Sequence, residues 1–600
     1  MLLKIKVVLA FIIIFTFLLA QDAEETILSL EDGTYHPTEL SETLMSLRQL
    51  PLNINNASSI ELTQLPWLSE LDIGKIIKAR NTKPISGWKE LRNIGINEIT
   101  ISKIKDYIVF REKPGLKLNQ RTRGEYSESK DNFESTLKYY QRTICGYKDL
   151  KLGILTQKDE GETDPIDFYS YFVEYKSNSF IKHTVLGKYR LAFGQGIIFA
   201  PKLGMSKSGA ATSTPVKKSF PIKPYTSSYE IWELEGGTVQ CNYRNFSIIP
   251  FFSSTKLSAN LSDNKITSFN QSGLHLDEDK KDNVKETILG TALNFNFGTN
   301  SFGVNFSQFE FDHEFKNPDW SNKYQAFSAN FILNRDNFPS FGEIAFADDK
   351  FAGVIGTKFG ENQFRHLLLF RYYEKNFPTW HGNPFSTQSR FDDEVGLYYG
   401  ITLLPFKRTK INCYFDVWNF PETRYFEKMP TVGSEQFIQL ETHFKTNSLR
   451  VTLQHKSKEK YISLDHAKIR DFDRTILRVD WWQMLGNICL KTRCELVAEY
   501  LQNEKIYEKG ILAYEQLKWI IEDFEIIAQI AVYHSDVLHY MYESNVDGIM
   551  QNSILQGDGI YSYMLVKYNL LENMELQFKV SDHWYSKDKM RLYLQVVSRF

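Results

Sequence analysis

The sequence predicts a mainly β fold, in which a large antiparallel transmembrane β-barrel of about 20 strands follows a small N-terminal all-α domain. Two observations carry this prediction. From about residue 121 to residue 600, apolar and polar residues alternate with a period of two, which is typical of strands with one apolar face. The alternation also persists through the last ten residues, RLYLQVVSRF. At roughly 22 to 25 residues per strand and loop, this region would hold an even number of strands near 20.

The first 20 residues have the pattern of a secretory signal peptide. Lys4 and Lys6 precede an apolar run from Val7 to Leu19, and Ala20 precedes polar residues. A single N-terminal membrane anchor is the alternative, although the run is short for a membrane span. Residues 21–49 are acidic and predict a linker that leads into a short helix.

Composition narrows the class of protein further. The formal net charge is -2, so no bulk attraction to nucleic acid or acidic lipid follows. Aromatic residues make up 14% of the chain, which suits the aromatic girdles of a membrane barrel. Five scattered cysteines show no metal-ligand spacing, and their odd number leaves at least one thiol unpaired.

Residues 50–113 differ from the rest of the chain. Apolar residues there recur at helical spacing and predict four short helices in two hairpins. The motifs Asn53 to Ser58, Leu65 to Ser69 and Ile94 to Asn97 resemble the tandem helix-hairpin-helix domain of competence-type DNA-binding proteins. That resemblance implies phosphate binding by backbone N–H groups at the hairpins.

In the first hairpin, Trp67 and Ser69 occupy the glycine positions of the family, and the carboxylates of Glu70 and Asp72 would repel phosphate. The resemblance therefore places any phosphate or DNA contact in the second hairpin, at Gly95, Ile96, Asn97, Lys103 and Lys105. A small plug or protein-interaction domain is the interpretation we favour.

The alternating region fits either a soluble sandwich or an outer-membrane barrel, since both are all-β. The signal peptide and the final strand favour the barrel. Leu592, Leu594, Val596 and Phe600 share one face of that strand, and this pattern resembles the assembly signal of Gram-negative outer-membrane proteins.

The stretch from Leu186 to Phe199 predicts a barrel strand. We expect Lys188 and Arg190 to face the lumen, with Gly194 and Gly196 extending that inward face, while Tyr189, Leu191 and Phe193 face lipid. The glycines would make room for a plug or solute, or permit a bend that closes the barrel. The run from Gly187 to Gly196, with Asn383 to Ser386, resembles large Bacteroidota outer-membrane proteins that carry helix-hairpin-helix repeats, a family that implies an architecture and no activity.

No catalytic, metal or cofactor motif stands out in the sequence, so we expect neither an enzyme nor a resident cofactor or metal. The acidic runs from Asp159 to Glu162 and from Asp392 to Glu394 could bind calcium. We interpret both runs as solvated loop faces.

The architecture predicts a channel, transporter or gated pore in the outer membrane, with its N-terminal domain in the periplasm as a plug or interaction domain. DNA uptake through the hairpins and a non-transporting envelope scaffold are the alternatives. The expected partners are outer-membrane lipid, the barrel assembly machinery and a periplasmic protein, with DNA disfavoured.

Overall fold

A computed structural model describes residues 51–600, together with Leu44 and Leu47. It leaves out residues 97–99, 111–114, 129–136, 202–206, 218–220, 335–337, 463–467, 503–505 and 585–589, and shorter gaps of one or two residues. The predicted signal peptide and most of the acidic linker therefore lie outside the described residues. No helix in the described part of the chain is long and apolar enough to cross a membrane.

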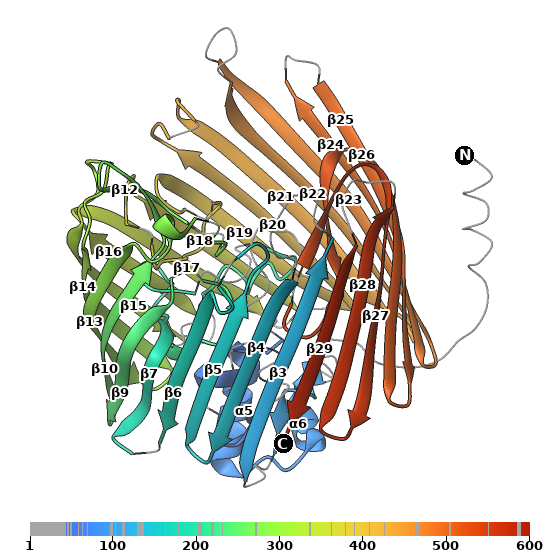
Figure 1. Ribbon diagram of the computed structural model, residues 1–600, viewed down its shortest axis with the longest axis horizontal. Helices are drawn as coiled ribbons and strands as arrows, with labels where there is room; N and C mark the ends of the chain where they lie inside the picture. The colour runs from blue at the N-terminus through green and yellow to red at the C-terminus, as the bar shows by residue number, and fades with distance from the viewer. Residues whose placement is uncertain are drawn as a thin grey trace.

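Within the described residues, 24 antiparallel strands follow one another around a closed barrel (Figure 1). The wall consists of β3 (Leu116–Ser127), β4 (Leu137–Tyr147), β5 (Leu150–Lys158), β6 (Phe168–Lys176), β7 (Ile181–Leu191), β9 (Leu234–Tyr243), β10 (Phe246–Leu257), β13 (Val284–Phe297), β14 (Asn300–Phe311), β15 (Lys323–Leu333), β16 (Ser340–Ala347), β17 (Lys350–Glu361), β18 (Phe364–Tyr373), β19 (Glu394–Phe406), β20 (Thr409–Phe420), β21 (Thr431–His443), β22 (Asn447–Ile462), β23 (Lys468–Leu485), β24 (Ile488–Leu501), β25 (Ile506–Ile521), β26 (Phe524–Glu543), β27 (Gln551–Leu571), β28 (Met574–Trp584) and β29 (Arg591–Arg599). Smaller elements are β8 (Ile222–Pro224), which pairs with the end of β7, the hairpin β11 (Ala259–Ser262) and β12 (Lys265–Phe269), and the 3₁₀ turn η1 (Glu278–Lys280).

The prediction of about 20 strands is wrong, because the chain turns more tightly than the prediction assumed. Two residues, Asp348 and Asp349, join β16 to β17, and Gly486 and Asn487 join β23 to β24. Asp348, Asp349 and Gly486 all have positive φ, as a two-residue hairpin loop requires. Short turns of this kind leave residues for additional strands.

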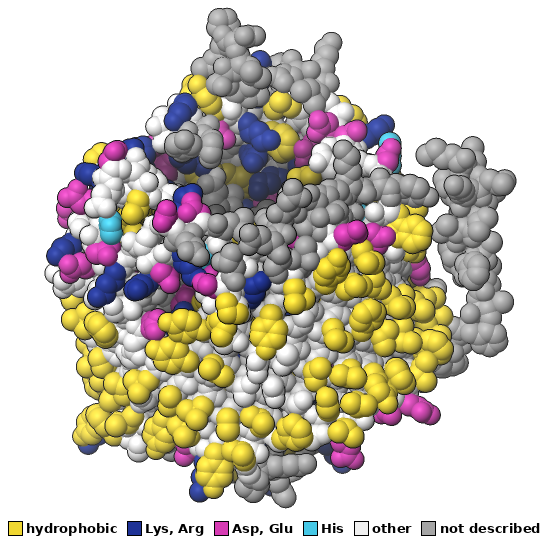
Figure 2. Space-filling view, viewed as in Figure 1, with side chains coloured by type: hydrophobic (Ala, Val, Ile, Leu, Met, Phe, Trp, Pro, Cys, Tyr) yellow, Lys and Arg dark blue, Asp and Glu magenta, His cyan; other side chains and the backbone are white. Residues whose placement is uncertain are grey.

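The outer surface of the barrel is apolar. Figure 2 shows a band of hydrophobic side chains around the lower part of the wall, with charged side chains gathered above it. Large apolar side chains exposed on the wall strands include those of Ile154, Tyr169, Phe246 and Leu594. Because closure leaves no unpaired sheet edge, such a wall can sit in hydrocarbon, and the chain is an outer-membrane barrel.

The two rims of the barrel differ in the length of their connections. At one rim the strands are joined by short turns, such as residues 148–149, 244–245 and 572–573. At the other rim lie long connections, such as residues 192–233 and 374–393. We call these the short-turn rim and the long-loop rim.

The N-terminal segment, residues 51–110, lies at the short-turn rim, inside the ring of strands (Figure 1). It contains β1 (Leu52–Asn53), α4 (Ser59–Leu62), α5 (Glu70–Thr82), α6 (Trp88–Asn93) and β2 (Ile108–Val109). The predicted all-α domain is wrong, because β1 and β2 form a parallel two-stranded ladder. The backbone N–H of Ile54 donates to the carbonyl oxygen of Val109 at 3.0 Å, although the apolar spacing around Val109 suggested a fourth helix.

Candidate functional site

The lumen of the barrel is occupied by parts of its own chain. After β7 ends at Leu191, the chain turns inward instead of continuing the wall. We call residues 192–201 and 207–217 the plug segment, and the described residues of 374–393, which leave out 379 and 389, the second inner segment. The two are joined by backbone hydrogen bonds from Ala200 N to His381 O, at 2.9 Å, and from Asn383 N to Gly196 O, at 2.8 Å.

An apolar core holds the plug segment against the wall. The ring of Phe199 lies 5.4 Å from that of Phe251 on β10 and 5.8 Å from that of Phe309 on β14, between ring centroids. Ile197 and Ile198 of the plug segment are buried in the same cluster. Inward faces of barrel strands are usually polar, so this apolar patch indicates a wall built to receive a plug.

Buried polar groups fasten the plug segment at two further points. Nζ of Lys207 lies 2.6 Å from Oδ2 of Asp416 on β20 and 2.9 Å from Oε2 of Glu435 on β21. On the opposite part of the plug segment, Glu343 of β16 accepts hydrogen bonds from the backbone N–H groups of Gln195 and Ile197. These contacts orient the plug segment as well as hold it.

A second intrusion comes from the hairpin of β26 and β27. A register shift between Ser535 and His539 marks where the hairpin leaves the regular wall pairing, and we call residues 536–556 the inner hairpin. Its tip reaches the inward face of the wall, where Asp547 pairs with Lys567 at 3.1 Å and Glu543 with Lys579 at 2.9 Å.

The residues predicted to face the lumen are covered by other parts of the chain. Lys188 and Arg190 are buried, and Nζ of Lys188 lies 3.1 Å from Oε1 of Glu233. Gly194 and Gly196 lie beyond the strand, in the plug segment, with φ of 55° and 85°. A Cβ at Gly194 would come within 2.8 Å of the Glu343 carboxylate, so glycine permits the inward turn and this close approach.

The expectation that Tyr189, Leu191 and Phe193 face lipid is wrong. All three are buried in the interior cluster. The regular alternation of β7 breaks at Gly187, where φ is 98°. Beyond that point both faces of the chain are covered, because the plug segment and its neighbours pack around it.

The residues of the predicted assembly signal lie on and beside the last wall strand. Leu594 is exposed on the outer face, as is Phe600, and Leu592 and Val596 share that face. β29 pairs with β3 and closes the ring. At the end of this seam, Phe600 and Leu118 exchange both backbone hydrogen bonds, at 2.6 and 2.8 Å.

The candidate phosphate contacts are used within the N-terminal segment or lie outside the described residues. The N–H groups of Gly95 and Ile96 donate to Arg92 O and Leu91 O, at 3.0 and 3.1 Å, and so end α6. Ile96 is buried and Lys105 is exposed. Asn97 and Lys103 lie outside the described residues. Two of the predicted backbone donors are therefore already satisfied.

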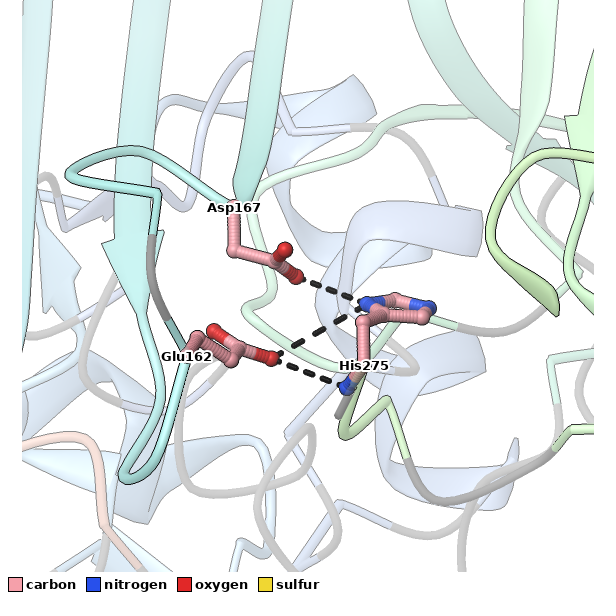
Figure 3. Close-up of side chains that lie close together, drawn as sticks. All are labelled: Glu162, Asp167 and His275. Carbon is pink, nitrogen blue, oxygen red and sulfur yellow. Dashed lines mark hydrogen bonds and ion pairs between the residues drawn. The ribbon is translucent and has the colours of Figure 1, made fainter. Parts of the chain in front are cut away.

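A compact group of acidic side chains and one histidine lies at the long-loop rim (Figure 3). Glu162 and Asp167 come from the loop between β5 and β6, and His275 comes from the loop between β10 and β13. Nδ1 of His275 lies 2.7 Å from Asp167 and 3.9 Å from Glu162. Glu230, which precedes β9, approaches the same ring nitrogen at 3.6 Å. We call these four residues the rim cluster.

The rim cluster is buried and strongly coupled. Side-chain exposure is 1% for Glu162, 4% for Asp167, 7% for Glu230 and 8% for His275. Burial, together with neighbouring negative charges, raises the pKa of Glu230 to about 10 and that of Glu162 to about 7. The hydrogen bond that the His275 ring donates to Asp167 raises the pKa of His275. Burial opposes ionisation of Asp167, but His275 and Lys281 outweigh it and lower its pKa.

Sequence analysis did not find the rim cluster. The run from Asp159 to Glu162 was interpreted as a solvated loop face, yet Glu162 is buried. The same correction applies to Asp393 and Glu394, which are buried in the barrel. In the rim cluster, 113 residues separate Glu162 from His275, so no local spacing could have signalled their contact.

No protein-family model and no curated protein matches the chain. Among solved structures, the siderophore receptor PirA from Pseudomonas aeruginosa is similar at 7% identity and a TM-score of 0.42, covering 82% of this chain and 81% of that one. The copper transporter OprC is similar at 8% identity, with a TM-score of 0.39 and coverage of 82% and 81%. The FrpB iron transporter from Neisseria meningitidis is similar at 7% identity, with a TM-score of 0.40 and coverage of 82% and 83%. At these levels, the ligands named for those proteins cannot be assigned to this chain.

Proposed function

We propose that this chain is a gated transport barrel of the outer membrane and that the conformation described above is its closed state. The observation that carries the proposal is the filling of the lumen by the plug segment. A barrel of 24 strands encloses a lumen that side chains of the wall cannot fill by themselves, so it is open or plugged. Here the plug segment belongs to the connection between two neighbouring wall strands. The plug segment can therefore move while the wall stays closed.

The attachment of the plug segment is consistent with a gate. Buried ion pairs contribute little net stability against well-packed apolar residues, yet they set one arrangement of the chain. Lys207, Asp416 and Glu435 form such a set between plug and wall. A cavity of about 290 Å³ also remains beside the inner hairpin, and its lining includes Arg123, Lys138, Tyr140 and Gln551.

We place the short-turn rim and the N-terminal segment in the periplasm, since outer-membrane barrels have short periplasmic turns and longer outer loops. The N-terminal segment then supplies a second closure and a surface for a periplasmic protein. Insertion would use the barrel assembly machinery. The origin in Bacteroidota is likewise a proposal, supported by the sequence motifs from Gly187 to Gly196 and from Asn383 to Ser386.

The test locks the gate reversibly. In a chain whose own five cysteines are replaced by serine, Gly209 and Gln439 are each replaced by cysteine. A short bismaleimide would join the two new thiols, because a Cβ at Gly209 would contact the Gln439 side chain. A cleavable linker of the same length serves as the reversal arm. Cells in which deletion of the gene causes a growth defect are then complemented with locked or unlocked barrel.

Transport requires the plug segment to move, so the locked barrel should fail to complement and cleavage should restore growth. Each single-cysteine chain treated with the same reagent is the control. Full complementation by the locked barrel would argue against transport through this lumen. It would favour the alternative of a non-transporting envelope scaffold.

A further inference from the structure

The rim cluster brings together side chains from three separate connections at the long-loop rim. Glu162 and Asp167 come from one loop, Glu230 follows β8, and His275 lies in the loop that contains β11 and β12. We propose that these four residues form a binding site for one divalent transition-metal cation, with Zn²⁺ or Mn²⁺ as the ions that suit it. This site goes beyond the proposed transport function and does not depend on it.

The charge of the cluster calls for a cation. Three carboxylates lie near one another in a buried space, and Lys281 pairs with Asp167 among them, at 2.5 Å, as well as with the neighbouring Asp164 at 3.7 Å. Glu230 accepts no hydrogen bond from the described residues, although its side chain is nine-tenths buried and points at the ring nitrogen of His275. Isolated buried carboxylates are costly unless they are paired or coordinate a metal. A divalent ion bound between Glu162 and Glu230 would compensate both of these carboxylates.

Three of the four donor atoms lie mutually close, and the fourth, Oε2 of Glu230, lies 3.6 Å from Nδ1 of His275. One oxygen each of Glu162 and Asp167 and one ring nitrogen of His275 lie within 4.8 Å of one another. Glu162 is held in place by backbone N–H groups of Asp159 and His275, at 2.7 and 3.0 Å. Each bonded oxygen keeps a further lone pair, which leaves it able to ligate.

A second contact orients the histidine. Its other ring nitrogen, Nε2, lies 3.0 Å from Oγ of Ser258. If Nε2 carries the proton and donates to Ser258, the lone pair of Nδ1 points into the carboxylate group. Metal-bound histidines commonly donate their second N–H in this way, which fixes the ring orientation.

The donor set decides the class of ion. Three carboxylates and one imidazole suit Zn²⁺ or Mn²⁺, whereas Ca²⁺ takes six to eight oxygen ligands and does not favour imidazole. Bound at this point, the ion would join three loops. One of them, residues 221–233, connects the plug segment to β9, so the ion would also restrain the chain that follows the plug segment.

The experiment uses the full chain, purified in detergent and stripped with EDTA. Equilibrium dialysis against ZnCl₂, MnCl₂ or CaCl₂, followed by elemental analysis, gives stoichiometry and affinity. We expect one Zn²⁺ or Mn²⁺ per chain and at least tenfold weaker Ca²⁺ binding. Glu230→Gln and His275→Ala should each weaken transition-metal binding by tenfold or more.

Matched controls remove the same groups elsewhere. Asp277→Asn changes an exposed carboxylate two residues from His275, and His313→Ala removes a partly exposed histidine at the same rim. Both should bind the ion as the parent chain does, and heat-modifiable gel migration confirms that each variant is folded. If His275→Ala does not fold, the isosteric Glu230→Gln carries the test. Absence of binding at one ion per chain, or equal loss in the controls, would overturn the proposal.

Discussion

Lys207 of the plug segment and Asp416 of the barrel wall form an ion pair of 2.6 Å in which both side chains are almost fully buried. The same carboxylate receives Arg371 of β18 at 2.8 Å, through its other oxygen. The wall therefore balances this charge partly through a residue of the plug. Without Lys207, the carboxylates of Asp416 and Glu435 would lack one positively charged partner in a site with little water.

We expect Lys207→Met to weaken the closed state. Removing one partner of a buried ion pair costs about 3–5 kcal/mol, since the remaining charge is left without compensation. In planar bilayers the variant should show frequent openings, whereas the parent chain stays closed. Lys280→Met, which removes an exposed lysine at the long-loop rim, is the control. Equal conductance of both variants would argue against this ion pair as the latch.

Gly382→Ala should also disturb the plug, by steric means. A Cβ at position 382 would collide with the carbonyl oxygen of Ile197 in the plug segment, and a backbone atom cannot rotate away. Overpacking of this kind costs about 1–3 kcal/mol. We expect a lower midpoint of urea unfolding and faster proteolysis of the plug segment. Gly124→Ala on β3 meets no atom within 4 Å and should behave as the parent does.

Tyr542 should hold the N-terminal segment against the inner hairpin. It is 5% exposed and is packed into the hydrophobic cluster of that segment, with Leu44 and Ile104 among its members. Tyr542→Ala would remove a buried aromatic contact worth roughly 3 kcal/mol. Limited proteolysis should then release the N-terminal segment at least tenfold faster.

Glu61→Gln provides a contrast to Tyr542→Ala, because the ion pair of Glu61 with Lys176 at 2.8 Å joins the same segment to the wall. Its partners are partly exposed, and such pairs contribute about 0–1 kcal/mol. Proteolysis of the Glu61→Gln variant should release the N-terminal segment at a rate within a few fold of the parent rate. A larger effect of Glu61→Gln than of Tyr542→Ala would contradict the assignment of the contact to apolar packing.

Deletion of Phe600 should impair closure of the barrel. The residue exchanges two backbone hydrogen bonds with Leu118, and these end the seam between β29 and β3. An unpaired edge in hydrocarbon leaves backbone groups without partners. Heat-modifiable gel migration should report a smaller fraction of folded barrel. Phe600→Leu keeps the backbone bonds, so comparable losses in both variants would assign the effect to the aromatic ring instead.

Local patterns in the sequence were enough to predict a mainly β chain with an antiparallel barrel, but neither its strand count nor the fold of the N-terminal segment. Alternation over strands such as β29 depends on residues two apart, so the sequence alone showed that Leu592, Leu594 and Val596 share a face. It could not show the strand count, since that depends on how tightly each turn is made. It also mistook β2 for the end of a fourth helix, because Leu52 and Ile108 meet only through tertiary pairing.

The tertiary structure decided what fills the barrel and where charged groups meet. Tyr189 and Phe193 looked lipid-facing because alternation distinguishes two faces of a strand but does not say what covers each face. The interior cluster covers Tyr189 and Phe193, and Phe168 and Glu233 lie against Lys188 on the same strand. Glu162, Glu230 and His275 likewise come from loops that only closure of the wall brings to one rim. Burial then changes their chemistry, since carboxylates that water would ionise freely are held together where little solvent reaches.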